Sequence, residues 1–271
     1  MIIVLHLVAL ALYLVAAGIQ IGSLVRGQRL VPRTAAALLV AAVALHAAGL
    51  VSFVVRYQEL PLVGLAPSLS TLAFLIAALL LGLATFGEAR PVGIVLLPIV
   101  SALLVGAVAL QIRPAGHVLA FRGWWLAFHV VLGFIGYVGL AVAFAAGLLY
   151  LLQFRELKGK RFGRVFRFFP ALATLDRLGR LGLRIGFPSL TLNLLLGWAW
   201  TIRFQHSFAF AMPQVIWGII TWVVFLAALV AGIRGPMKAR SLALATVVGF
   251  TLVVAAYVIL RLAVTGGRLF L

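Results

Sequence analysis

The stretch GWWLAFHVVLGFIGYVGLAVAFAAGLLYLLQFR, residues 123–155, is apolar almost throughout and contains a single histidine, His129. An apolar run of more than about 20 residues can cross the ~30 Å hydrocarbon core of a bilayer as a helix. Inside a membrane, an ionisable side chain must find a partner or serve a function. The stretch therefore predicts a membrane-spanning helix and makes His129 a candidate functional residue.

The composition extends this interpretation to the whole chain. Hydrophobic residues make up 65% of the 271 residues and charged residues 10%, whereas soluble domains are about half apolar and a quarter charged. The sequence therefore predicts an all-α, polytopic integral membrane protein, with one eight-span domain over residues 1–271. The eight predicted spans are residues 1–24, 34–56, 66–87, 91–112, 124–153, 185–204, 213–233 and 241–264.

The formal net charge of +18 at pH 7 is explained by the placement of the basic residues. Sixteen of the 22 Lys and Arg residues fall between spans or at span ends on one side of the predicted topology. Such an excess follows the positive-inside rule and requires no nucleic-acid partner. We therefore expect a membrane protein in contact with the lipid bilayer, with the basic loops cytoplasmic and both termini extracytoplasmic.

One loop is longer than the others, at residues 154–184. Its second half, ALATLDRLGRLGLR, has a leucine at every third position opposite several arginines. This pattern is typical of a helix that lies in the cytoplasmic membrane interface. Contact with anionic lipid explains such a basic segment, and docking of a partner protein is the alternative.

The titratable residues do not favour an enzyme. The chain has no cysteine, and its acidic residues, Glu59, Glu88, Glu156 and Asp176, all lie at span ends or in loops. A paired-carboxylate site within the membrane is therefore excluded, as are disulfides and thiol relays. No H-E-x-x-H zinc pattern or phosphate-binding glycine loop occurs. We expect no catalytic residue.

Five histidines remain, and two of them lie within predicted spans. Three of the histidines lie near outward span ends or in outward loops: His6, His117 and His206. Contact with water or with lipid headgroups is enough to explain a histidine at such a position. His46 lies near the middle of the second span, and His129 lies one to two turns inside the fifth. A hydrogen bond to a carbonyl of a neighbouring helix, or to Asn193, is the structural explanation for these two.

Haem ligation is the functional explanation. Neutral imidazole is the usual axial ligand of haem iron, and a bis-histidine site needs no other protein donor. Gly133 and Gly136 follow His129 on one helix face, and Gly49 follows His46 in the same way. Glycine beside a ligand would let a porphyrin approach the backbone. Ligation of haem b by His46 and His129 is therefore the functional alternative to a structural hydrogen bond, although glycine also serves ordinary helix packing.

Several segments resemble one known family. FHVVLGFIGYVGLAVAFAAGLLYLLQFRELK, ATLDRLGRLGLRIGFPSLTLNLLLGWAW and VIWGIITWVV are similar to successive helices of cytochrome c assembly proteins of the CcsA/CcmC type. Eight short spans with ALHAAGL in the second most resemble the HemX/YpjD branch. The resemblance implies haem binding in the bacterial inner membrane through His46 and His129, for haem transport and cytochrome c assembly. The tryptophan-rich outward segment of the longer relatives is missing at residues 203–216, so a synthetase activity is not expected.

The depths of the two histidines leave the number of haem sites open. At 1.5 Å per residue, His129 lies roughly 8 Å and His46 roughly 16 Å below the outward surface. One iron can bind both if the helices tilt; otherwise His206, His6 or His117 is the candidate partner of His129. Two other functions remain open: a membrane regulator or scaffold that docks a cytosolic haem-synthesis enzyme, and a transporter without haem. Other cytochrome c assembly or haem-synthesis proteins are the expected partners.

Overall fold

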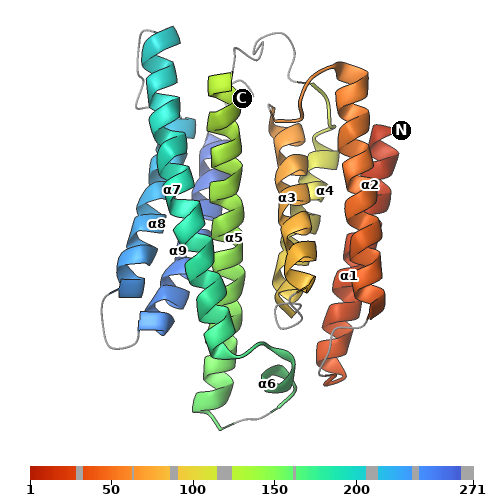
Figure 1. Ribbon diagram of the computed structural model, residues 1–271, viewed down its shortest axis with the longest axis vertical. Coiled ribbons are helices and arrows are strands. Elements are labelled where there is room, and N and C mark those ends of the chain that lie inside the picture. The colour runs from red at the N-terminus through yellow and green to blue at the C-terminus, as the bar shows by residue number, and fades with distance from the viewer. Residues whose placement is uncertain are drawn as a thin grey trace. The chain divides into compact units, whose positions relative to one another are not determined.

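The computed structural model describes residues 1–28, 33–62, 64–85, 91–114, 124–160, 163–205, 213–233 and 238–263, and the regular secondary structure within these ranges is helical (Figure 1). The all-α prediction is therefore confirmed for the described residues. The helices are α1 (Ile2–Val25), α2 (Arg33–Tyr57), α3 (Leu65–Thr85), α4 (Gly93–Ala109), α5 (Trp124–Lys158), α6 (Arg164–Phe168), α7 (Leu172–Gln205), α8 (Pro213–Ile233) and α9 (Lys238–Ala263).

Each of the eight predicted spans overlaps one of these helices, although α7 begins 13 residues before its predicted span at residues 185–204. Among the described residues, α1, α2, α3, α5, α7, α8 and α9 are long and apolar enough to cross a membrane. Helix α4 is equally apolar but has only 17 residues, with Pro98 inside it. At 1.5 Å per residue it is about 26 Å long, slightly less than the ~30 Å hydrocarbon core.

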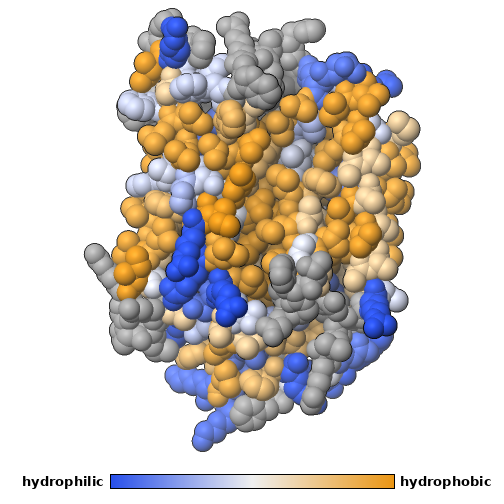
Figure 2. Space-filling model, in the orientation of Figure 1, coloured by the Kyte–Doolittle hydropathy of each residue, from blue (hydrophilic) through white to orange (hydrophobic). Residues whose placement is uncertain are grey.

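The helices present large apolar side chains on their outer surfaces. Val55 is 68% exposed, Leu14 52% and Leu195 52%. Figure 2 shows apolar residues over most of the visible face, with the most hydrophilic residues at its top and in its lower half. Apolar surface of this extent is stable when lipid covers it. The protein is therefore a multi-pass membrane protein.

The chain divides into two compact units. Unit 1 comprises Met1–Ala115 with Leu149–Leu175, and unit 2 comprises Gly116–Leu148 with Asp176–Leu271. Unit 1 thus contains α1 to α4, the last part of α5, α6 and the first residues of α7. Unit 2 contains most of α5 and α7 together with α8 and α9. Of the two histidines predicted to lie within spans, His46 therefore belongs to unit 1 and His129 to unit 2.

In unit 1, α1 packs on α2 and α4, and α3 packs on the same two helices. The buried face of α1 carries both small and polar residues. Ala9, Ala16 and Ala17 are buried there together with His6 and Tyr13. Small residues allow neighbouring helices to approach closely, which is the usual basis of helix packing in membranes. The α1 face therefore brings polar side chains against α2 and α3.

In unit 2, α5 and α7 meet through glycines. A Cβ atom built on Gly139 would lie 2.5 Å from the carbonyl oxygen of Gly182, and one built on Gly182 would lie 2.5 Å from that of Gly139. No side chain fits at either position, because the atoms opposite belong to the backbone. This contact fixes the register of α7 along α5. Beside it, Leu140, Leu183 and Phe225 belong to the apolar core of the unit.

The segment at residues 154–184 differs from the prediction of a loop with a separate interfacial helix. Helix α5 continues to Lys158, α6 is a single short helix, and residues 172–184 are the first turns of α7. Of the leucines in the predicted pattern, Leu175 and Leu178 are buried within the protein, whereas Leu181 is 48% exposed. Asp176 pairs with Arg180 one turn later, at 3.0 Å.

We predict that Gly139→Ala destabilises the protein. The added methyl group meets backbone atoms that cannot rotate away, and overpacking of this kind costs about 2 kcal/mol. A loss of that size lowers the melting temperature by roughly 4–8 °C for a chain of this length. Thermal unfolding in detergent measures the effect. Gly18→Ala is the control, since nothing lies within 4 Å of a Cβ atom at that position; equal melting temperatures for the two variants would contradict the prediction.

Candidate functional site

His129 lies in the second turn of α5, and its ring packs against α7. The ring fits there because residue 197 is a glycine: a Cβ atom at Gly197 would lie 2.8 Å from Cε1 of His129. One helical turn earlier, Asn193 is 7% exposed and holds the histidine through hydrogen bonds. Trp125, one turn before His129, donates its indole N–H to the carbonyl of Leu196 at 3.0 Å. Helix α7 therefore supplies the partners that orient this end of α5.

The hydrogen bonds define the tautomer of His129. Nδ1 lies 2.8 Å from the backbone carbonyl oxygen of Asn193, and a carbonyl oxygen can only accept, so Nδ1 carries the proton and donates. The side-chain amide of Asn193 also lies 3.1 Å from Nδ1. It cannot donate to a protonated nitrogen, and it donates instead to the backbone carbonyl of His129 at 2.5 Å.

This arrangement leaves the lone pair of Nε2 available. Among the described residues no hydrogen bond to Nε2 of His129 is found, and the side chain is half-buried. A histidine that donates Nδ1–H to a backbone carbonyl and keeps an unprotonated Nε2 has the arrangement typical of metal-ligating histidines. His129 therefore fits an axial ligand of haem iron. The structural explanation given above, a bond to a neighbouring helix at Asn193, is also confirmed, and the two are compatible.

The glycines predicted to leave room for a porphyrin have protein atoms beside them. A Cβ atom at Gly133 would lie 3.0 Å from the amide nitrogen of Asn193, and one at Gly136 would lie 3.2 Å from Cβ of Leu190. At Gly49, a Cβ atom would lie 2.7 Å from Cε1 of His6. In this structure the three glycines thus accommodate α7 and His6. Contact with haem at these positions stays a prediction from the sequence.

His46 lies in unit 1 in a fully buried group of polar side chains. Its Nε2 lies 3.0 Å from Oγ of Ser70 on α3, and its Nδ1 lies 3.3 Å from the hydroxyl of Tyr13 on α1. His6 shares the same serine, with Nε2 at 3.0 Å from Oγ of Ser70. The two imidazole centroids are 5.2 Å apart, with the rings at 73°.

His6 is the main residue that the sequence analysis placed incorrectly. A headgroup histidine was expected, but the side chain is 0% exposed. Its Nδ1 lies 2.8 Å from the carbonyl of Ile2 in the preceding turn. The position is buried because Gly49 on α2 lets the ring lie against that helix while Ser70 approaches from α3. The only local signal was the spacing of His6, Ala9 and Tyr13 along one helix face.

The hydrogen bonds in this group have one consistent direction. The carbonyl of Ile2 requires a protonated Nδ1 on His6, so Nε2 of His6 accepts from the hydroxyl of Ser70. The oxygen of Ser70 then accepts Nε2–H of His46, which leaves Nδ1 of His46 to accept from Tyr13. Both nitrogens of His46 are therefore engaged. Haem ligation by His46 would have to break one of these two bonds, and it stays a prediction from the sequence.

The predicted ligands are distributed over both units. His46 belongs to unit 1 and His129 to unit 2, while His117 and His206 lie outside the described residues. The ligation of one iron by His46 and His129 stays a prediction from the sequence. Within the described ranges, no group of three or more His, Cys, Asp or Glu side chains is arranged to hold a metal ion.

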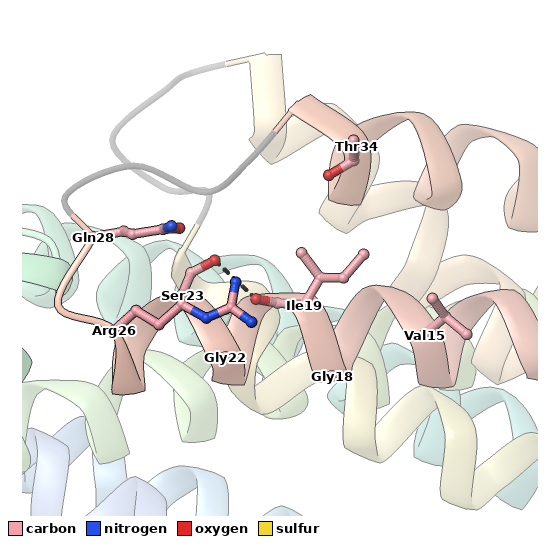
Figure 3. Close-up of a pocket in the computed structure, with 8 residues that line it drawn as sticks. All are labelled: Val15, Gly18, Ile19, Gly22, Ser23, Arg26, Gln28 and Thr34. Carbon is pink, nitrogen blue, oxygen red and sulfur yellow. Dashed lines mark hydrogen bonds between the residues drawn. The ribbon is translucent and has the colours of Figure 1, made fainter.

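A cavity of about 440 Å³ lies at the C-terminal end of α1, away from the described histidines. Figure 3 shows polar side chains gathered there, with the hydroxyl of Ser23 bonded to the carbonyl of Ile19 and the Arg26 guanidinium beside them. The cavity is lined by Val15, Gly18, Ile19, Gly22, Ser23, Arg26, Gln28 and Thr34. None of these described lining residues is a histidine, a cysteine or a carboxylate, so we do not assign haem to the cavity.

Comparison with known proteins identifies relatives of the chain. The family model described as "Cytochrome C assembly protein" matches residues 31–266. A cytochrome c biogenesis protein CcsA from Guillardia theta is 28% identical over 156 residues, which are 52% of this chain and 52% of the relative. The corresponding protein from Mesostigma viride is 26% identical over 192 residues, 61% of this chain and 62% of the relative.

Other relatives match over shorter segments. A CcsA protein from Chlamydomonas reinhardtii is 28% identical over 136 residues, which cover 49% of this chain and 37% of the relative. The chain therefore spans about half the length, or less, of the first relatives that it matches.

We predict that His129 is a neutral Nδ1–H tautomer with an unprotonated Nε2. The carbonyl of Asn193 enforces this form, whereas the bonds of His46 enforce the Nε2–H form. Solid-state ¹⁵N NMR of the histidine-labelled protein in bilayers distinguishes the tautomers, and His→Gln variants assign the signals. The same tautomer at both residues would contradict the hydrogen-bond assignment.

Proposed function

This chain belongs to the cytochrome C assembly protein family, and we propose that within it the chain binds b-type haem in the membrane and takes part in haem trafficking for cytochrome c biogenesis. The single observation that carries the proposal is the free Nε2 of His129, with Nδ1 held by a carbonyl. In this proposal haem is the molecule that the chain carries. Its iron would offer one coordination position to the imidazole of His129.

The proposed role of the surrounding residues is to hold His129 in place. Asn193 keeps Nδ1 protonated and bonds the backbone carbonyl of His129, so that ring orientation and tautomer are set together. Gly197 leaves space for the ring. Partners of this kind raise the basicity of a ligating histidine, and their loss typically lowers metal affinity 10- to 100-fold.

The proposal does not include His46, because both of its nitrogens are hydrogen-bonded. It also includes no bond-making step: the chain would bind haem and pass it to other proteins of cytochrome c assembly. The relatives named CcsA support partners of this kind. Because this chain matches only part of their length, the proposal does not extend to the whole activity of a CcsA protein.

We expect His129→Ala to lower haem occupancy at least tenfold. The variant removes the only described imidazole with a free nitrogen, while the half-buried position limits the packing loss. Haem content is measured by the Soret absorbance of the purified protein relative to its total concentration. His46→Ala is the matched control and should change occupancy less than twofold. Loss of haem in the His46 variant with retention in the His129 variant would contradict this assignment.

We also propose a bacterial inner-membrane location with both termini extracytoplasmic. Arg26, Arg33 and the arginines of residues 155–184 would then face the cytoplasm, in keeping with the positive-inside rule.

A reporter that is active only outside the cytoplasm, fused after Leu271, should be active, and the same reporter inserted after Gly159 should be inactive. Gly159 lies just beyond the end of α5, where an insertion interrupts no helix. The reverse pattern would show the opposite orientation.

A further inference from the structure

The cavity at the C-terminal end of α1 has an apolar side formed by one face of that helix. Val15, Gly18, Ile19 and Gly22 line this side. Val15 is 51% exposed, and a Cβ atom built on Gly18 or on Gly22 would meet open space. The two glycines therefore leave a groove on the outer surface of a helix that is long and apolar enough to cross a membrane.

The polar end of the cavity lies where α1 ends and α2 begins. Arg26, Gln28 and Thr34 line it, and Figure 3 shows the Arg26 side chain extending back along α1 toward Ile19. Because α1 is long enough to cross the hydrocarbon core, a residue directly after its last turn lies at the membrane surface. Thr34 is in the first turn of α2, where free backbone N–H groups favour an anion.

The fold does not need the guanidinium of Arg26. A basic side chain near a helix C-terminus often bonds the last carbonyls of the helix, but those of α1 already have partners. Backbone N–H groups of the next turn bond three of them, the carbonyls of Gly22, Ser23 and Leu24. Arg164, from α6, donates to the fourth, that of Val25, at 2.6 Å. Among the described residues, no hydrogen bond or ion pair of the Arg26 side chain is found.

Further positive charge lies at the same end of α1. A Cβ atom built on Gly27 would lie 3.3 Å from Cγ of Arg164 and 3.8 Å from Nη2 of Arg167. Both arginines belong to unit 1, together with the cavity. In the described part of the chain, neither they nor Arg26 form an ion pair with a carboxylate. The polar end of the cavity is therefore cationic and lacks a counterion from the protein.

We propose that this cavity binds one anionic phospholipid, with the headgroup phosphate at Arg26 and an acyl chain along Gly22 and Gly18. The proposal is independent of haem. A volume of about 440 Å³ is that of an ordinary small-ligand site, since such sites measure roughly 300–1,000 Å³. A charged end at the membrane surface joined to an apolar groove matches the two parts of a lipid molecule.

The side chains at the polar end can donate hydrogen bonds to a phosphate. The guanidinium of Arg26, the amide of Gln28 and the hydroxyl of Thr34 are all donors, and the bond from a guanidinium to phosphate is charge-assisted. The hydroxyl of Ser23 is not among them, because it donates to the carbonyl of Ile19 at 2.8 Å.

A second copy of the chain is the other occupant that the groove could receive. Gly18 and Gly22 have the G-x-x-x-G spacing by which membrane helices approach one another closely. In a symmetric parallel pair, Arg26, one turn after Gly22 on the same face, would lie opposite its own copy. Two like charges without a carboxylate between them oppose that contact. The charge therefore favours a phospholipid over a second copy.

Native mass spectrometry of the full chain in detergent tests the proposal with two lipids that have the same acyl chains. Phosphatidylglycerol has a net negative charge, and phosphatidylcholine has none. The first molecule of phosphatidylglycerol should bind at least about fivefold more tightly, since one basic residue near an anionic membrane surface contributes roughly that factor. Equal affinities for the two lipids would overturn the proposal.

Variants test the two ends of the site separately. Arg26→Gln should lower the affinity for phosphatidylglycerol about fivefold and leave that for phosphatidylcholine unchanged. Gly22→Leu fills the groove without changing the charge and should also weaken phosphatidylglycerol binding. Arg177→Gln, at an exposed arginine in the first turns of α7, is the matched control and should change neither affinity. An equal loss in the Arg177 variant, or no loss in the other two, would contradict the assignment.

Thermal unfolding in detergent distinguishes a lipid from free phosphate. Phosphatidylglycerol should raise the melting temperature of the wild type, because a ligand that binds only the folded state stabilises it. Inorganic phosphate should not, since it cannot occupy the groove. An equal rise with inorganic phosphate would mean a site for a soluble anion. A dimer that forms without lipid and is lost in Gly22→Leu would mean a second copy, and either result would overturn the proposal.

Discussion

A polar group inside a membrane helix has no water to bond with, so its partners must come from the protein itself. This constraint explains the arrangement of both histidine groups. Asn193 provides a carbonyl to Nδ1 of His129, and Ser70 provides one hydroxyl to two imidazoles. The number of partners decides the chemistry of each ring. Among the described residues, His129 finds partners for one nitrogen only, whereas His46 finds partners for both.

Glycine makes these contacts sterically accessible. Gly197 admits the ring of His129, and Gly49 admits that of His6. Gly139 and Gly182 bring α5 and α7 so close that their backbones touch, which sets the height of Asn193 relative to His129. The same residue type thus serves helix approach and side-chain placement. A glycine beside a histidine in the sequence therefore does not by itself indicate space for a cofactor.

The spans could be predicted because apolar length is a property of a continuous segment. The bond from His129 to Asn193 was foreseen as one alternative, since few polar residues occur within the spans. His6 could not be placed correctly, because its burial depends on Gly49 and Ser70, which lie on two other helices. The helix predicted near residues 172–184 is the first part of α7 and not a separate element, because an apolar periodicity does not show where a helix ends.

Iron in haem has two axial positions, and the bonding described above bears on how many of them this chain would fill. In the proposed function His129 supplies one nitrogen, and the bonds of His6 and His46 leave neither of those two residues free. The other axial position would then be filled by His117, by His206 or by a ligand from outside the chain. A haem held by one protein bond is released more easily than one held by two, because only one coordination bond must break. Such a site is suited to passing haem on, and less suited to keeping it as a permanent cofactor.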